Sequence, residues 1–293
     1  MDWIRKIKQF FKTNDALTGF IAVNVVVFVL YNVVHMFYVL FAVRHHFPLD
    51  QWLAVPADID TLLRRPWTLI TYMFFHQGAL HLLLNMLWLY WFGKIFRIYF
   101  SGWQLANVYI LGGLVGALFY VAFYNIFPVF SVDRNFAILL GASAGVLAVV
   151  MAISCYVPRY AINLLFVGRV RLITIALVTI VIDIISISTS DNAGGHIAHL
   201  GGALLGYLFA VNFQKGKDIT AWFGKFCAWI GGFFKPKPKL KMAYRRPPTD
   251  DREYNRQRNE NQQVIDRILD KISKGGYDSL TKAEKETLFQ QKR

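Results

Sequence analysis

The chain has 293 residues, of which 55% are hydrophobic and 16% aromatic, but only 17% are charged. This composition excludes an ordinary soluble domain of that length and favours an integral membrane protein. The net charge of +14 does not indicate a nucleic-acid partner, because the basic residues cluster at the chain ends and in particular loops without a recognition motif. We therefore expect them to contact anionic lipid and to set the topology.

Apolar stretches of about 20 residues, which is the length that crosses a bilayer, occur six times in the chain. The predicted spans are Leu17–Leu40, His76–Phe96, Trp103–Tyr124, Phe136–Tyr156, Leu172–Ser188 and Ile197–Phe213. Met1 to Asp15 is basic, and the first apolar stretch after it is long enough to span and is not followed by a convincing small-residue cleavage site. We therefore expect this first span to stay in the protein. The predicted fold is an all-α integral membrane protein with a six-helix bundle.

Basic residues in the short segments predict how the spans are oriented, because Lys and Arg are enriched on the cytoplasmic side. The basic residues form two sets on opposite sides of the membrane. The larger set lies in the N-terminus and in the second and fourth loops, and the smaller set, in the other loops, comprises Arg44, Arg64, Arg65 and Arg134. The larger set is Arg5, Lys6, Lys8, Lys12, Lys94, Arg97, Arg159, Arg169 and Arg171. We expect both termini to face the cytoplasm.

The segments outside the six predicted spans differ from the spans in composition. The first loop, Phe41 to Pro66, mixes aromatic and charged residues, which is typical of a structure in the headgroup region. Ile219–Phe234 predicts an interfacial helix, and a Pro-rich basic linker follows it. The tail predicts two short helices, with Thr281 or Ser279 and Glu284 starting the second. We divide the chain into 1–16 (cytoplasmic segment), 17–213 (membrane domain), 214–249 (interfacial helix and linker) and 250–293 (helical cytoplasmic tail).

Polar residues inside the spans are few, and each needs a partner in the membrane. His81, Asn85, Ser143 and His199 all fall in the first half of an even-numbered span, so they share one depth on the outer side. At 1.5 Å per residue, Ser143 would lie roughly 10 Å below the start of its helix. Each residue alone also fits a packing role, but together they predict a hydroxyl, an imidazole and two further donors in one cavity.

Small residues favour close packing of the fourth and sixth spans. Gly141 and Gly145 are four residues apart in one of them, and Gly202 and Gly206 are four apart in the other. We expect this packing to bring Ser143 within hydrogen-bond distance of His199. Asp183 in the fifth span predicts a polar contact between helices, and we assign it no catalytic role.

The motifs His81-Leu-Leu-Leu-Asn85, Gly141-Ala-Ser143 and Ala198-His199-Leu-Gly-Gly202 with Gly206 resemble those of bacterial rhomboid intramembrane serine proteases. The resemblance runs from about Leu17 to Phe213. It implies that Ser143 is the nucleophile and His199 the general base, as a dyad without a third carboxylate. It also implies an oxyanion hole formed by His81, Asn85 and the backbone N–H of Ser143.

Four positions depart from the common pattern of that family. Ala144 follows the serine where glycine is usual, and Leu147 replaces an aromatic residue beside the histidine. Thr68 stands where arginine is usual, and Arg97 stands near the place of a glutamate. Both members of the dyad are present, so we expect an active enzyme.

The predicted function is intramembrane hydrolysis of peptide bonds in or near transmembrane helices of protein substrates, in the bacterial inner membrane, without a metal or organic cofactor. The alternative is a catalytically inactive rhomboid-like protein that binds or escorts membrane helices. A small proton-coupled transporter fits less well, because the two halves show no internal repeat. A His-Glu-x-x-His metalloprotease motif and a second intramembrane aspartate are both missing from the sequence. The partner of the tail is unknown.

Overall fold

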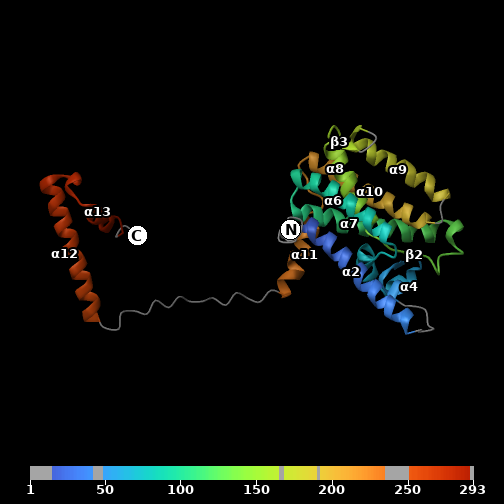
Figure 1. The fold of residues 1–293 in the computed structure, drawn as a ribbon, viewed down its shortest axis with the longest axis horizontal. Coiled ribbons are helices and arrows are strands. Elements are labelled where there is room, and N and C mark those ends of the chain that lie inside the picture. Colours follow the sequence, from blue (N-terminus) through green and yellow to red (C-terminus); the bar gives the residue numbers. More distant parts are fainter. Residues whose placement is uncertain (1–14, 42–48, 165–167, 190–191, 235–250, 291–293) are drawn as a thin grey trace. The chain divides into compact units, whose positions relative to one another are not determined.

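A computed structural model describes residues 15–41, 49–164, 168–189, 192–234 and 251–290. Its described residues belong to two compact units, within Met1–Lys235 and Pro236–Arg293 (Figure 1). The predicted basic N-terminal segment, residue Arg44 and most of the predicted linker lie outside the described residues.

The first unit is a bundle of helices with short elements in the connections (Figure 1). Its long helices are α2 (Ala16–Leu40), α6 (Ala79–Tyr99), α7 (Gly102–Ile126), α9 (Leu172–Thr189) and α10 (Ala193–Gln214), with the shorter α8 (Ser143–Tyr156) among them. The connections contain α3 (Leu49–Leu53), β1 (Val55–Pro56), α4 (Ile59–Arg64), α5 (Thr68–Thr71), η1 (Tyr72–Phe74), η2 (Pro128–Phe130), β2 (Ile138–Leu139), β3 (Ala161–Leu164), β4 (Gly168–Arg171) and α11 (Ala221–Phe234).

Five helices of the described residues are long and apolar enough to cross a membrane: α2, α6, α7, α9 and α10. They confirm five of the predicted spans, with boundaries that differ by a few residues. Local signals fix some of their ends. The side chain of Ser101 accepts a hydrogen bond from the Gln104 N–H and the Gln104 side chain accepts one from the Ser101 N–H, which starts α7. Asn192 caps α10 by accepting from the Gly195 N–H.

The predicted fourth span, Phe136–Tyr156, is wrong in its first part. The helix α8 begins only at Ser143, and its 14 residues extend about 21 Å. Residues before it form β2, which pairs antiparallel with β1 through Val55↔Leu139 and Pro56↔Ile138. Gly141 has φ +114°, a conformation that ends any helix arriving from Phe136.

Helix α8 lies at the centre of the bundle, where it contacts α6, α7, α9 and α10. Most of its residues are buried, including Ala144, Ala148 and Ala152. Irregular backbone at membrane depth is tolerated where protein encloses it, which explains how a short helix preceded by an extended segment fits there. By contrast α9 exposes most of its surface, and of its residues only Leu172, Ala176 and Asp183 are buried.

The first loop folds against the bundle and carries an aromatic cluster. The indole N–H of Trp67 donates to the carbonyl oxygen of Trp52, and the two rings stack with centroids 5.7 Å apart. The guanidinium carbon of Arg65 lies 4.8 Å from the centre of the Trp52 ring. Asp58 caps α4 by accepting hydrogen bonds from the Thr61 hydroxyl and from the Thr61 N–H. These two bonds, the hydroxyl first, hold the pKa of the Asp58 carboxyl below its usual range.

The fourth loop forms a β-hairpin, with Ala161↔Arg171 and Asn163↔Arg169 as paired residues of β3 and β4. After α10, the helix α11 contacts α7, where the Asn107 side chain donates to the Thr220 carbonyl oxygen. Trp222 and Trp229 of α11 expose 62% and 63% of their surface, and the interfacial position of this helix stays a prediction.

The second unit consists of α12 (Asp251–Gly275), η3 (Tyr277–Ser279) and α13 (Lys282–Gln290). Among its described side chains, Ile268 and Leu280 are the buried apolar ones. The amino group of Lys271 lies 2.9 Å from the Glu284 carboxylate. The predicted start of the last helix is found at Thr281, whose N–H donates to Glu284 while its hydroxyl accepts from the Glu284 N–H.

Candidate active site

Ser143 is the first residue of α8, and the segment before it is held by neighbouring backbone and side chains. The Gly141 N–H donates to the Tyr72 carbonyl oxygen at 2.9 Å, and the Ala142 N–H donates to His76 Nε2 at 3.3 Å. The first helical hydrogen bond of α8 runs from the Val146 N–H to the Ala142 carbonyl oxygen. The N–H groups of the first turn therefore point out of the helix end beside the Ser143 hydroxyl.

His81 and Asn85 lie one turn apart on α6. The Asn85 side chain donates to the His81 carbonyl oxygen at 2.9 Å. A Cβ atom on Gly141 would lie 2.7 Å from Cε1 of the His81 ring, so this glycine allows both the positive φ and the close approach of the imidazole. The His81 ring also meets the His76 ring edge-on, with centroids 5.0 Å apart. The backbone before Ser143 and the ring of His81 are thus in close contact.

His199 lies on α10, whose backbone is in close contact with α8. A Cβ atom on Gly202 would lie 2.1 Å from the Ala144 carbonyl oxygen, and one on Gly206 would lie 2.2 Å from the Ala148 carbonyl oxygen. The absence of side chains at these two glycines lets α10 approach until His199 faces Ser143.

The predicted close packing of the fourth and sixth spans is confirmed for Gly202 and Gly206, whereas the part predicted for Gly141 and Gly145 is wrong. Gly141 precedes α8 and faces His81, while a Cβ on Gly145 would lie 2.7 Å from the Tyr109 carbonyl oxygen of α7. Helix α8 turns Ala144 and Ala148 toward α10 instead. The sequence showed which residues are small, but only the position of the helix start decides which face they occupy.

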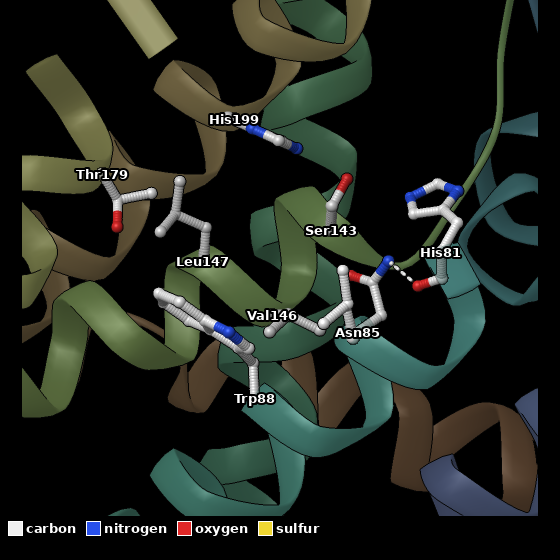
Figure 2. Close-up of a pocket in the computed structure, with 9 residues that line it drawn as sticks. His81, Asn85, Trp88, Ser143, Val146, Leu147, Thr179 and His199 are labelled. Carbon is white, nitrogen blue, oxygen red and sulfur yellow. Dashed lines mark hydrogen bonds between the residues drawn. The ribbon is translucent and has the colours of Figure 1, made fainter. Parts of the chain in front are cut away.

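Four predicted site residues line one cavity of about 210 Å³. Figure 2 shows the Ser143 hydroxyl directed into the space between the rings of His199 and His81, with Asn85 facing the same space. They come from α6, α8 and α10. The rest of the cavity wall consists of Leu84, Trp88, Val146, Leu147 and Thr179.

Ser143 and His199 are both described by the structure, and they do not form the predicted hydrogen bond with each other. Nδ1 of His199 lies 2.8 Å from Oδ1 of Asp183, which leaves Nε2 on the side of the ring that faces the cavity. The Ser143 hydroxyl and His199 Nε2 thus face the same cavity without a hydrogen bond between them.

The sequence interpretation missed the carboxylate behind His199. Asp183 is only 3% exposed, and its Oδ1 also lies 2.7 Å from Nδ1 of His196. The available signals were the cost of a carboxylate inside a span and the spacing of the two histidines, which places them on one helix face. Nothing in the sequence indicated that α9 would bring Asp183 to that face.

The ligand-type atoms of Asp183, His196 and His199 lie within 4.8 Å of one another, so these three residues have the donor types of a zinc site. Both histidine nitrogens are at hydrogen-bond distance from the same carboxylate oxygen, an arrangement that satisfies them without an ion.

The four departures from the family pattern occupy different places. Leu147 lines the cavity, and Ala144 is buried against α7 and α10. Thr68 is buried and donates its hydroxyl proton to the Arg65 carbonyl oxygen. Arg97 pairs with Asp15 at 3.0 Å, away from the cavity.

Residues 63–215 match the Rhomboid domain family, and the matched residues make up slightly more than half of the chain. The chain belongs to the rhomboid family and is a multi-pass, all-α membrane protein. Residues 249–290 match a second family, DUF6576, whose function is unknown.

Two relatives from Arabidopsis thaliana are similar to this chain. RHOMBOID-like protein 12, mitochondrial, is 26% identical over 212 residues, which cover 69% of this chain and 60% of that protein. Inactive RHOMBOID-like protein 8 is 33% identical over 82 residues, which cover 28% of this chain and 23% of that protein. The chain thus spans less than two thirds of the length of either relative.

Proposed function

We propose that this protein is an intramembrane serine protease in which Ser143 and His199 act as the catalytic dyad. The observation that carries the proposal is the single cavity shared by Ser143, His199, His81 and Asn85 (Figure 2). A structural role for each of these residues separately does not explain why a hydroxyl, an imidazole and an amide from three helices face one space.

The proposed reaction has two stages. Ser143 Oγ attacks the carbonyl carbon of the scissile peptide while His199 Nε2 accepts the hydroxyl proton, and then His199 donates it to the leaving amine. The imidazole of His81, the amide of Asn85 and the N–H of Ser143 stabilise the negative oxygen. Water then gives a proton to His199 Nε2 and attacks the acyl carbon, the bond to Ser143 Oγ breaks, and Oγ takes the proton back from His199 as the acid product leaves. Neither stage needs a metal or organic cofactor.

The scissile backbone has to reach Ser143 before it can be cleaved. In a helical segment the carbonyl groups are hydrogen-bonded within the helix and covered by its side chains. We therefore expect a transmembrane substrate to present an unwound segment to Ser143. The apolar wall formed by Trp88, Val146 and Leu147 favours an uncharged side chain next to the cleaved bond.

We also propose that the protein lies in a bacterial inner membrane with both termini in the cytoplasm. The hairpin residues Arg169 and Arg171 and the α6 residues Lys94 and Arg97 mark the cytoplasmic face. Ser143, at the opposite end of its helix from that face, then receives water from the outer side.

A second candidate is a catalytically inactive member that binds or escorts membrane helices through the same cavity. Leu147 in the cavity wall, Ala144 after the serine and the unformed Ser143–His199 hydrogen bond favour it, as does the word "Inactive" in the name of one relative.

Labelling of the purified full-length protein with a fluorophosphonate separates the two candidates, because the probe reacts only with an activated serine. We expect labelling and cleavage of a model transmembrane substrate by the wild type, and neither by Ser143→Ala. Ser154→Ala is the matched control, since Ser154 is a fully buried serine on the same helix. A folded wild type that is neither labelled nor cleaves, or a labelled Ser143→Ala, would exclude the protease.

A further inference from the structure

The side of His199 that faces away from the cavity is occupied by a buried carboxylate. Oδ1 of Asp183 lies 2.8 Å from His199 Nδ1 and 2.7 Å from His196 Nδ1. The Asp183 side chain is 4% exposed, whereas those of His196 and His199 are 19% and 22% exposed. The contact is therefore made inside the protein, between α9 and α10.

The geometry fixes which nitrogen of His199 carries the proton. A carboxylate oxygen only accepts, and it has two lone pairs, so it can take one N–H from each imidazole. A neutral His199 bonded in this way carries its proton on Nδ1, and its Nε2 keeps a lone pair on the side of Ser143. That is the form in which a neutral histidine acts as a base.

His196 makes the arrangement geometrically possible. It lies three residues before His199 on the same face of α10, so both rings reach one carboxylate from one side. The second N–H donor holds Oδ1 in place and offsets part of the cost of burying the charge. Asp183 Oδ2 is buried and has no hydrogen-bond partner among the described residues.

The charge of Asp183 has its largest effect during the reaction. A neutral imidazole donates a hydrogen bond to the carboxylate but brings no opposite charge to it. When His199 takes the proton of Ser143, an imidazolium forms beside it, and the attraction between opposite charges is strong where water is largely excluded. A carboxylate placed in this way stabilises the transition state more than the ground state.

We propose that Asp183 is a positioning residue that fixes the orientation and tautomer of His199, so that this chain has a Ser143–His199–Asp183 triad. The proposal rests on the protease function proposed above and deepens it. Asp183 does not line the cavity, so it acts on the reaction only through His199.

The test uses Asp183→Asn in the purified full-length protein, because asparagine has nearly the same shape but its amide can donate to Nδ1 and favour the wrong tautomer. We expect kcat for a transmembrane substrate to fall by about 10²- to 10⁴-fold. KM should change by less than about threefold, since Asp183 does not touch the cavity. Asp60→Asn, on the exposed side of α4, controls for the loss of a carboxylate.

A spectroscopic readout separates positioning from general support of the fold. In ¹⁵N-histidine NMR of the wild type, with His199 assigned from the His199→Gln spectrum, Nε2 should resonate as a nitrogen without a proton. In Asp183→Asn, it should move toward the protonated position while the thermal unfolding midpoint stays within a few degrees. The wild-type spectrum alone decides the tautomer if Asp183→Asn does not fold.

Several results would overturn the proposal. They are a wild-type kcat in folded Asp183→Asn, a protonated Nε2 in the wild type, or a loss of kcat without any change of tautomer. Inactivation of the wild type by EDTA and recovery with Zn²⁺ would assign the three residues to a metal instead. If the folded wild type neither cleaves the substrate nor reacts with fluorophosphonate, the proposed protease function itself is wrong. If the wild type is active and Asp183→Asn has the same kcat, only the proposed triad is wrong.

Discussion

A Cβ atom on Gly202 would lie 2.1 Å from the carbonyl oxygen of Ala144, so α10 and α8 are in backbone contact one residue away from Ser143. The helix that carries His199 and the helix that carries Ser143 are held together there without intervening side chains. This contact sets the distance across which the proposed dyad works.

Gly202→Ala should therefore reduce both stability and activity. The added methyl group meets main-chain atoms, which cannot turn aside, and overpacking of this kind typically costs about 1–3 kcal/mol. The thermal unfolding midpoint in detergent and the cleavage rate both report the effect. Gly19→Ala is the matched control, because a Cβ on this helical glycine meets no atom within 4 Å. Equal midpoints for the two variants would show that the α8–α10 contact does not require glycine.

His81→Ala and Asn85→Ala should each lower kcat by roughly 10- to 1,000-fold, the range expected when one oxyanion donor is lost. KM should change less, because the donors act mainly on the charged intermediate. Asn32→Ala is the control for Asn85, since Asn32 makes the same bond to the carbonyl oxygen four residues earlier in α2. Wild-type turnover in both single variants and in the double variant would leave His81 and Asn85 with a structural role.

Cysteine labelling tests the orientation of the bundle. After replacement of Cys155 and Cys227, a cysteine at the exposed Asp133 should react in intact spheroplasts with a membrane-impermeant thiol reagent. A cysteine at Asn163 in the β-hairpin should react only after the membrane is opened. The expectation follows from the basic residues of that hairpin. The reverse pattern would place the Ser143 cavity on the cytoplasmic side.

Glu284 makes the start of α13 sensitive to acid. The hydrogen bond from the Thr281 N–H, with further contacts from the Lys271 and Thr281 side chains, lowers the pKa of this carboxyl to about 2. Because the folded-state pKa is depressed, the stabilisation is present above the usual glutamate pKa of about 4.3 and is lost as pH falls from there toward 2. The exposure of Glu284 to solvent and salt weakens the effect.

Amide hydrogen exchange of residues 281–290 in the full-length protein measures this effect. Amide exchange itself depends on pH. The wild type is therefore compared with Glu284→Gln at each pH, so that this common dependence cancels. We expect faster exchange in the variant at pH 6 and converging rates as pH approaches 2. Equal protection at pH 6 would contradict a role for Glu284 in starting the helix.

Hydrophobicity and local motifs were sufficient to predict the long helices of this protein, but not the short helices and strands of its loops. Long apolar runs bounded by capping residues such as Ser101 form helices wherever they are placed in a membrane, because the backbone must satisfy its own hydrogen bonds there. The same reasoning found the Thr281 capping box. The motifs around His81, Ser143 and His199 identified residues that the fold brings to one cavity.

Only the tertiary structure decided where α8 begins and what stands behind His199. Phe136–Ala142 is apolar enough to continue a helix, but the pairing of β2 with β1 and the positive φ of Gly141 place the helix start at Ser143. Asp183 lies 16 residues before His199 in the chain and on another helix. Hydropathy reports how each helix meets lipid, whereas contacts between helices depend on their rotation and relative height, which packing alone determines.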